Sequence, residues 1–162
     1  MESIKKIMEK QDMNKARNLR FLVDFMKAAG VTTNQAAQLM GVSRQAVHHW
    51  FVKDDMKVSQ IQRLLELCGY RIEFELQKET AVSSLPVRVT MSVVNPAGPQ
   101  RLAFLKNALD RHDVSRDDLA TRLGVGKATL YNWFKADDCF FSYVYAIAVA
   151  ENMKLDIRIA PL

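Results

Sequence analysis

Apolar positions in the chain follow a helical period over most of its length. Residues 18–29 place leucine, valine, methionine and alanine on one face of a 3.6-residue repeat, which predicts an amphipathic helix. Thr32 and Gln35 have the spacing of a capping box, so a short helix is expected to begin there and to end at Gly41. Two further helices follow, the first with Ser43 as its N-cap.

Three stretches instead alternate apolar and polar residues with a period of two, which is typical of strands. They read YRIEFEL, VRVTMSV and MKLDIRI. A lone strand leaves its backbone groups unpaired. We therefore expect the three strands, near 71–76, 87–93 and 154–159, to form one shared antiparallel sheet.

The chain is an internal repeat. Residues 19–76 align on residues 102–159 without a gap, and AAQLMGVSRQAVHHWF corresponds to LATRLGVGKATLYNWF. The identical pairs include Ala37 with Ala120, Gly41 with Gly124, Trp50 with Trp133, Asp54 with Asp137 and Asp55 with Asp138. Two copies are too few for a solenoid. The repeat therefore predicts two small helical units that form a pseudo-dimer within one chain.

The repeat also predicts how the chain divides. Residues 1–76 would hold an N-terminal extension and a first unit that ends in a strand. Residues 77–100 would be a linker that contains a strand, and its end, NPAGPQ, has a loop composition. Residues 101–162 would form the second unit, which also ends in a strand.

Two short helices joined by a tight glycine turn form a helix-turn-helix. A small residue lets the two helices approach where they cross, and an aromatic residue three positions after an apolar one continues the buried stripe. We accordingly expect these side chains to be buried: Ala37 and Ala120 at the crossing, Val42 and Val125 in the turn, and Trp50 and Trp133 on the second helix. The opposite face of the second helix is left exposed.

The stretches NQAAQLMGVSRQAVHHWF and DDLATRLGVGKATLYNWF resemble the helix-turn-helix of the lambda-repressor/Cro-like (XRE) family of phage and bacterial regulators. The resemblance covers the helical part of both copies. It implies a mostly α fold of two lambda-repressor-like domains with short strands in a small shared sheet. It also implies a sequence-specific regulator of transcription, such as a repressor, that binds double-stranded DNA. The two cysteines, with no CxxC motif, fit a reducing cytoplasm.

Family members usually carry one such domain and dimerise to read a palindrome. Here two domains are fused, and each ends in a strand, the feature that Cro-like members use to pair subunits. The resemblance therefore implies an intramolecular Cro-like dimer. A homodimer in which each chain uses one domain is the alternative.

In this family the N-terminal half of the second helix enters the major groove. The base-facing candidates implied by the resemblance are Ser43, Arg44, Gln45, His48 and His49 in the first copy, and Lys127, Ala128, Tyr131 and Asn132 in the second. Arginine can hold guanine, and glutamine or asparagine can pair with adenine, whereas alanine can only touch a thymine methyl. Thr33 and Arg116 lie at the N-terminal ends of the two preceding helices and are candidate contacts to DNA phosphates.

Other motifs suggest chemistry but have simpler explanations. Adjacent histidines on a helix point about 100° apart, so His48 and His49 cannot chelate one metal ion together. We interpret the two Asp-Asp pairs as loop and helix-capping residues. Cys68 and Cys139 form no CxxC motif, so we expect buried helix residues and neither a disulfide framework nor a zinc site.

Composition narrows the classes of function. The 162 residues are 49% apolar with a net charge of +5, a mild basic excess that suits a polyanionic partner but is small for nonspecific binding to bulk DNA. The chain has no glycine-rich phosphate loop, nucleophile elbow or HExxH motif, which argues against an enzyme and against a cofactor. We do not expect the charged opening MESIKKIMEKQDM to be a signal peptide, and no apolar run in the sequence is long enough to cross a membrane.

One other class remains open. The chain could be a protein-interaction module, antitoxin-like or polymerase-binding, that keeps the helix-turn-helix fold. The exposed face of the second helix discriminates between the two classes. That face is basic and rich in hydrogen-bonding groups in the first copy, whereas the second copy, KATLYN, offers one lysine and a tyrosine.

Overall fold

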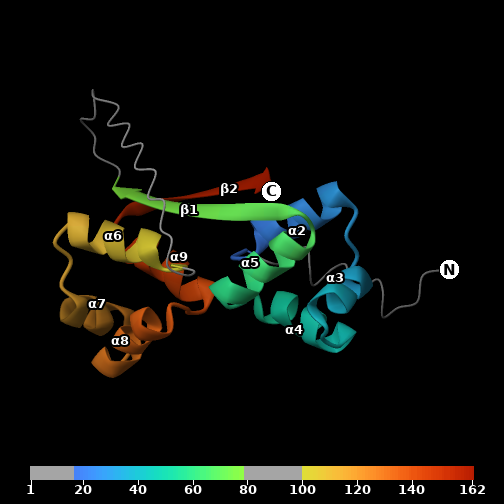
Figure 1. Ribbon diagram of the computed structural model, residues 1–162. Helices are drawn as coiled ribbons and strands as arrows, with labels where there is room; N and C mark the ends of the chain where they lie inside the picture. Colours follow the sequence, from blue (N-terminus) through green and yellow to red (C-terminus); the bar gives the residue numbers. More distant parts are fainter. Residues whose placement is uncertain (1–16, 79–99) are drawn as a thin grey trace. The chain divides into compact units, whose positions relative to one another are not determined.

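The computed structural model describes residues 17–78 and 100–162. Within these residues it contains eight helices and a two-stranded sheet, which confirms the mostly α fold (Figure 1). The first copy contributes α2 (Arg20–Ala29), α3 (Thr33–Met40), α4 (Arg44–Lys53), α5 (Val58–Leu67) and β1 (Tyr70–Lys78). The second copy contributes α6 (Ala103–Arg111), α7 (Arg116–Leu123), α8 (Lys127–Ala136), α9 (Phe141–Ala150) and β2 (Met153–Pro161).

The helix starts agree with the capping residues that the sequence predicts. The Thr32 hydroxyl accepts the Gln35 N–H at 3.2 Å, and the Gln35 side chain accepts the Thr32 N–H at 2.9 Å, which completes the capping box of α3. Ser115 caps α7 by accepting the Asp118 N–H at 3.3 Å. Ser43 caps α4 in the same way.

In each copy, an aspartate at the end of the second helix of the helix-turn-helix caps the first helix of that copy. Asp54 lies at the C-cap of α4 with φ 56°, and its carboxylate accepts the backbone N–H groups of residues 17–19 at 2.8–2.9 Å. Asp137 does the same at the end of α8, with φ 54° and bonds from the N–H groups of Arg101 and Leu102. The interpretation of these residues as helix caps is confirmed, although the helix they cap lies far back in the sequence.

The strands predicted near 71–76 and 154–159 are confirmed as β1 and β2, which pair with each other. They run in opposite directions, and the Leu162 N–H donates to the Gly69 carbonyl at 3.0 Å (Figure 1). The apolar face of β1 is buried. The third strand, predicted at 87–93, and the N-terminal extension lie outside the described residues.

The described residues divide into two compact units that do not follow the repeat copies. Unit 1 gathers the first copy up to Glu73 together with Cys139–Tyr145 and Ile157–Leu162. Unit 2 gathers the described part of Phe74–Asp138 together with Ala146–Asp156. The division of the chain by copies at 1–76, 77–100 and 101–162 stays a prediction.

Unit 1 therefore contains a segment of the second copy, Cys139–Tyr145, as part of its core. Asp55 accepts both the N–H and the hydroxyl of Ser142, at 3.0 and 2.6 Å, and so caps α9. The Phe141 N–H donates to the Met56 carbonyl at 2.8 Å. The buried Phe141 ring also lies 5.2 Å from the ring of Phe21. Burial of this ring is a large apolar contribution to a unit of this size.

We expect Asp54→Ala and Asp137→Ala each to lower the free energy of unfolding by about 1–2 kcal/mol. The backbone donors lose their acceptor, and alanine disfavours a positive φ. Urea unfolding measures the effect. Asp24→Ala removes an exposed carboxylate from α2 and should change the stability by less than about 0.5 kcal/mol. An equal loss at Asp24 would contradict the capping role.

We expect a fragment of residues 1–78 to lack a cooperative thermal transition in near-UV circular dichroism, because it lacks both segments that the second copy places in unit 1. In the full chain, Phe141→Ala should cost about 3–5 kcal/mol. Phe140→Ala is the matched control, since Phe140 is 42% exposed, and it should cost less than about 1 kcal/mol. A fragment that unfolds as cooperatively as the full chain would show that the first copy folds without these segments.

Candidate nucleic-acid interface

Each copy joins its helix-turn-helix through a glycine in the left-handed conformation, with φ 67° at Gly41 and 69° at Gly124. The N–H of the residue after each glycine donates back to the carbonyl of Ala37 or Ala120 at 3.0 Å. A β-carbon on either glycine would meet no atom within 4 Å, so the positive φ is what requires glycine here. Both alanines are buried, as predicted for the helix crossing.

In the first copy, α4 buries Val47 and Phe51 and turns a polar face outward. The candidates Ser43, Arg44, Gln45 and His49 are exposed, and His48 is half-buried. The Ser43 hydroxyl already accepts the Ala46 N–H at 3.1 Å as the helix cap. Four of these five candidates therefore lie on the exposed surface, and Thr33, at the start of α3, is half-buried.

In the second copy, α8 buries Leu130 and Trp133 and exposes all four candidates: Lys127, Ala128, Tyr131 and Asn132. The Lys127 ammonium lies 3.5 Å from the carboxylate of Asp117 on α7, and both side chains remain largely exposed. Tyr131 is 54% exposed. The helix begins at Gly126, which offers no capping side chain.

Arg116 is engaged by three groups within the protein. Its guanidinium donates to the Val114 carbonyl at 3.1 Å and forms an ion pair with Asp110. The guanidinium carbon also lies 5.6 Å from the centre of the Phe134 ring on α8. The side chain is only 17% exposed, so little of it is presented to a ligand.

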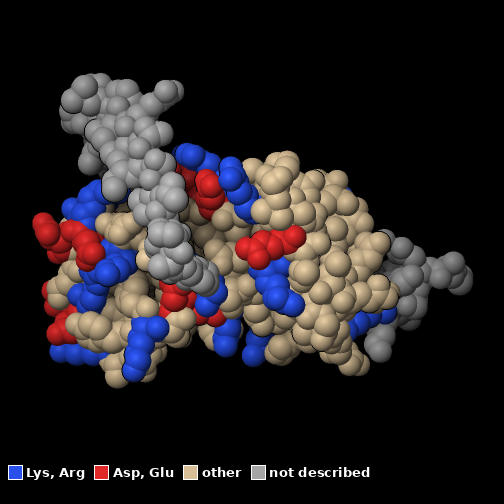
Figure 2. Space-filling view, viewed as in Figure 1, with Lys and Arg blue, Asp and Glu red and all other residues tan. Residues whose placement is uncertain are grey.

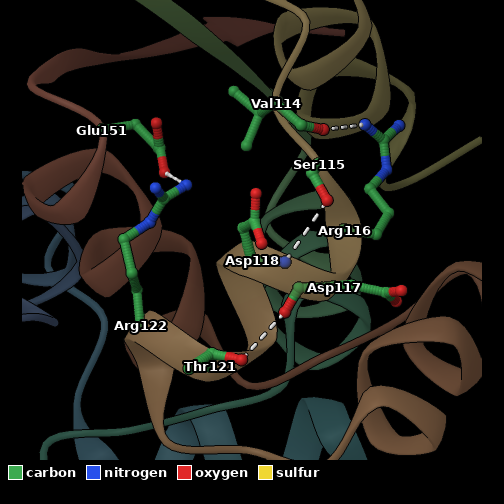
Figure 3. A network of polar contacts seen from close by, with 8 residues as sticks. All are labelled: Val114, Ser115, Arg116, Asp117, Asp118, Thr121, Arg122 and Glu151. Carbon is green, nitrogen blue, oxygen red and sulfur yellow. Dashed lines mark hydrogen bonds and ion pairs between the residues drawn. The ribbon is translucent and has the colours of Figure 1, made fainter.

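A second ion pair that the sequence did not reveal holds the other end of α7. Arg122 pairs with Glu151, which follows α9 and is nearly buried (Figure 3). In the first copy the aligned residues are Leu39 and Cys68, neither of which carries a fixed charge. The contact could have been identified from the repeat, because two oppositely charged residues of the second copy align with two uncharged residues of the first.

The aromatic pair at the end of the second helix is buried in opposite order in the two copies. Trp133 is buried and Phe134 half-buried, whereas Phe51 is buried and Trp50 half-buried. The prediction that both tryptophans are core residues is therefore right for Trp133 and wrong for Trp50. The two neighbours straddle the edge of the buried face, so the packing of each copy decides which one enters it.

The two turn valines are also more exposed than predicted. Val42 is 38% exposed and Val125 is half-buried, because hydrogen bonds from their backbone N–H groups close the turn without burial of the side chains.

The cysteines flank helices instead of lying inside them: Cys139 is buried before α9, and Cys68, the C-cap of α5, is half-buried. Burial raises the pKa of the Cys68 thiol.

Charge is mixed on the face of the molecule that Figure 2 shows. Figure 2 shows Lys and Arg side chains interspersed with Asp and Glu on the visible face, with no single continuous basic area.

Burial, together with the positive charges of Lys78 and Arg111, lowers the pKa of His112. This residue ends α6 and lies on neither α4 nor α8. Among residues 17–78 and 100–162, no group of three His, Cys, Asp or Glu side chains could hold a metal ion. In the same ranges, no helix has the length and apolar character needed to cross a membrane.

Comparison with known proteins supports the helix-turn-helix assignment for the second copy. Residues 103–159 match the family model described as the bacteriophage CI repressor helix-turn-helix domain. The match covers α6 to α9 and most of β2. Neither the curated proteins nor the solved structures gave a match.

We expect Phe51→Ala to cost about 3–5 kcal/mol of stability and Phe134→Ala clearly less, although the two residues occupy the same position of the repeat. The reason is their different burial, since Phe51 is only 1% exposed. Chemical unfolding of both variants measures the difference. Equal losses would mean that the two copies pack their aromatic pairs alike.

Proposed function

We propose that this protein is a sequence-specific regulator of transcription, of the phage or bacterial type and most simply a repressor, that binds double-stranded DNA in the cytoplasm. One observation carries the proposal. In both copies the second helix of a helix-turn-helix exposes a polar face, and in the first copy that face is rich in hydrogen-bonding groups. The match of residues 103–159 to a CI repressor domain supports the same assignment.

The first copy has the chemistry to read bases directly. Arg44 can hold guanine O6 and N7 with two parallel hydrogen bonds, and Gln45 can pair with adenine N6 and N7. Both side chains are exposed on the first turn of α4, the part of such a helix that enters the major groove. His49 is exposed one turn further on. Ser43 is already bonded as the helix cap and serves best to hold the helix start against a phosphate.

The second copy would read a different sequence. Asn132 can pair with adenine, Ala128 can only contact a thymine methyl, and Tyr131 offers an exposed hydroxyl. Lys127 has to exchange its contact with Asp117 for a phosphate or a base. A homodimer of one domain reads a palindrome, whereas the two copies of this chain present different side chains on similar scaffolds. We therefore propose that one chain binds two unlike half-sites about 34 Å apart, which is one turn of the duplex.

A protein-binding role for the second copy is the alternative. The exposed face of α8 combines Ala128 and Tyr131 with a lysine whose charge is partly balanced by Asp117. Tyrosine is enriched at protein interfaces, and the loss of free positive charge weakens attraction to DNA. In that case only the first copy would contact DNA. Substitutions in α8 would then leave base preference unchanged.

The test is selection of binding sites from random duplex DNA at a stated salt concentration, followed by affinity measurements on the selected site. We expect Arg44→Ala and Gln45→Ala each to lose about 1–3 kcal/mol of discrimination at one or two base pairs, because each removes a bidentate contact. Lys127→Ala should weaken binding to all sequences if it meets a phosphate.

Arg63→Ala is the control, since it removes an exposed arginine from α5, outside the helix-turn-helix. It should leave base preference unchanged. Failure to select any sequence, or an Arg44→Ala protein with the parent's preferences, would refute base reading by the first copy. The number of chains per duplex, measured on the selected site, tests whether one chain spans both half-sites.

A further inference from the structure

Arg116 stands at the start of α7, where a helix-turn-helix can meet the DNA backbone, yet its contacts lead into the protein. We propose that Arg116 is a positioning residue that orients the recognition helix α8, and that it does not contact DNA. The inference rests on the proposed function. According to this inference, Arg116 affects how the second copy discriminates between bases, and the effect is transmitted through Phe134.

The first argument is that the guanidinium joins three elements. It pairs with Asp110 in α6, donates to the Val114 carbonyl between α6 and α7, and lies over the Phe134 ring of α8. Figure 3 shows the side chain directed to Val114 at one end of α7, while Arg122 reaches Glu151 at the other end. Both ends of α7 are thus held by a charge-assisted contact.

The second argument comes from the first copy. There the residue aligned with Arg116 is the uncharged Thr33, and the residue aligned with Phe134 is Phe51, which is buried. In the second copy Phe134 is only half-buried, and the guanidinium covers part of its ring. Arginine stacked on an aromatic face supplies packing that the apolar core does not supply at this position.

The third argument is the proximity of this contact to a base-facing residue. Arg116, Phe134 and Tyr131 line one open cavity of about 540 Å³ in unit 2. Tyr131 and Phe134 lie three residues apart on α8 and so share a side of the helix. A shift of the Phe134 ring would therefore move the surface that presents Tyr131.

The contacts of Arg116 also leave it poorly suited to bind a phosphate. One terminal nitrogen bonds to Asp110 and the other to Val114, the carboxylate balances its charge, and most of the side chain is covered. Lys127, by comparison, is largely exposed in its contact with Asp117. If the second copy contacts the DNA backbone with a cation, Lys127 is the more accessible choice.

Two substitutions of Arg116 separate the two roles on the selected DNA site. A phosphate contact tolerates Arg116→Lys, whereas Arg116→Met would reduce the dependence of log affinity on log salt by about 0.9. A positioning residue gives another result. Lysine cannot make the same pair of bonds, so both variants should lose about fivefold or more in discrimination at base pairs that Asn132→Ala also affects. The salt dependence should stay unchanged.

Asp110→Asn gives a further test with a smaller structural change, because the two roles of Arg116 predict opposite effects on DNA binding. If Arg116 contacted DNA, loss of the competing carboxylate would strengthen binding to all sequences. If Arg116 positions α8, the same variant should lose discrimination under the second copy. Asp113→Asn is the matched control, because it also removes one exposed negative charge, and asparagine tolerates the positive φ of 52° found there. Thermal unfolding checks that each variant is folded at the temperature of the assay.

The outcomes separate this inference from the proposed function. Loss of discrimination in Arg116→Lys and Asp110→Asn, with the control unchanged, supports the positioning role. A lower salt dependence in Arg116→Met with unchanged base preference overturns it and leaves DNA binding intact. A parent chain that selects no DNA sequence overturns the proposed function itself.

Discussion

The aspartate that ends the second helix of each helix-turn-helix is the constraint on which the rest of the structure depends. Asp54 and Asp137 adopt a positive φ that stops α4 and α8, and their carboxylates accept the N–H groups at the start of α2 and α6. One aspartate thus ends α4 or α8 and holds the beginning of α2 or α6 against it. Because the carboxylate satisfies donors that no helical carbonyl can reach, the two helices are linked by hydrogen bonds as well as by apolar packing.

On this common frame the two copies use different means to hold the helix-turn-helix. In the first copy Phe51 is buried in the core, and Thr33 stands at the start of α3. The second copy adds two arginine ion pairs, at Arg116 and Arg122, and leaves Phe134 half-buried. Ion pairs weaken as the salt concentration rises and depend on the geometry of the two groups, whereas the stabilisation from apolar burial is non-directional. The copies are therefore unequal in their supports as well as in their exposed side chains.

The two compact units do not coincide with the two copies of the repeat. The segment Cys139–Tyr145 belongs to the second copy by sequence and to unit 1 by its contacts, where Asp55 caps it and Phe141 is buried. Both strands are divided between the units in the same way. A chain that completes one copy with part of the other cannot lose either copy without exposing apolar surface.

The sequence by itself determined the local features: the helix starts at Thr32, Ser43 and Ser115, the glycine turns, and the positions of β1 and β2. These follow from capping, from backbone conformation and from the period of apolar residues, all of which act within a few positions of the chain. It also identified surface candidates on α4 and α8, since a buried stripe implies an exposed face. Their role in binding DNA stays a prediction.

Only the tertiary structure decided which of two adjacent aromatic residues is buried, which carboxylate meets Arg116, and which unit receives Cys139–Tyr145. Neighbours on a helix lie about 100° apart, so two residues at the edge of the buried stripe cannot be ranked by periodicity. Arg116 looks like a phosphate ligand in the sequence because it opens a helix, and its contacts with Asp110 and Phe134 exist only once α6, α7 and α8 are packed together. A contact between distant residues depends on where the packed elements bring them, and the spacing of the residues along the chain does not encode that position.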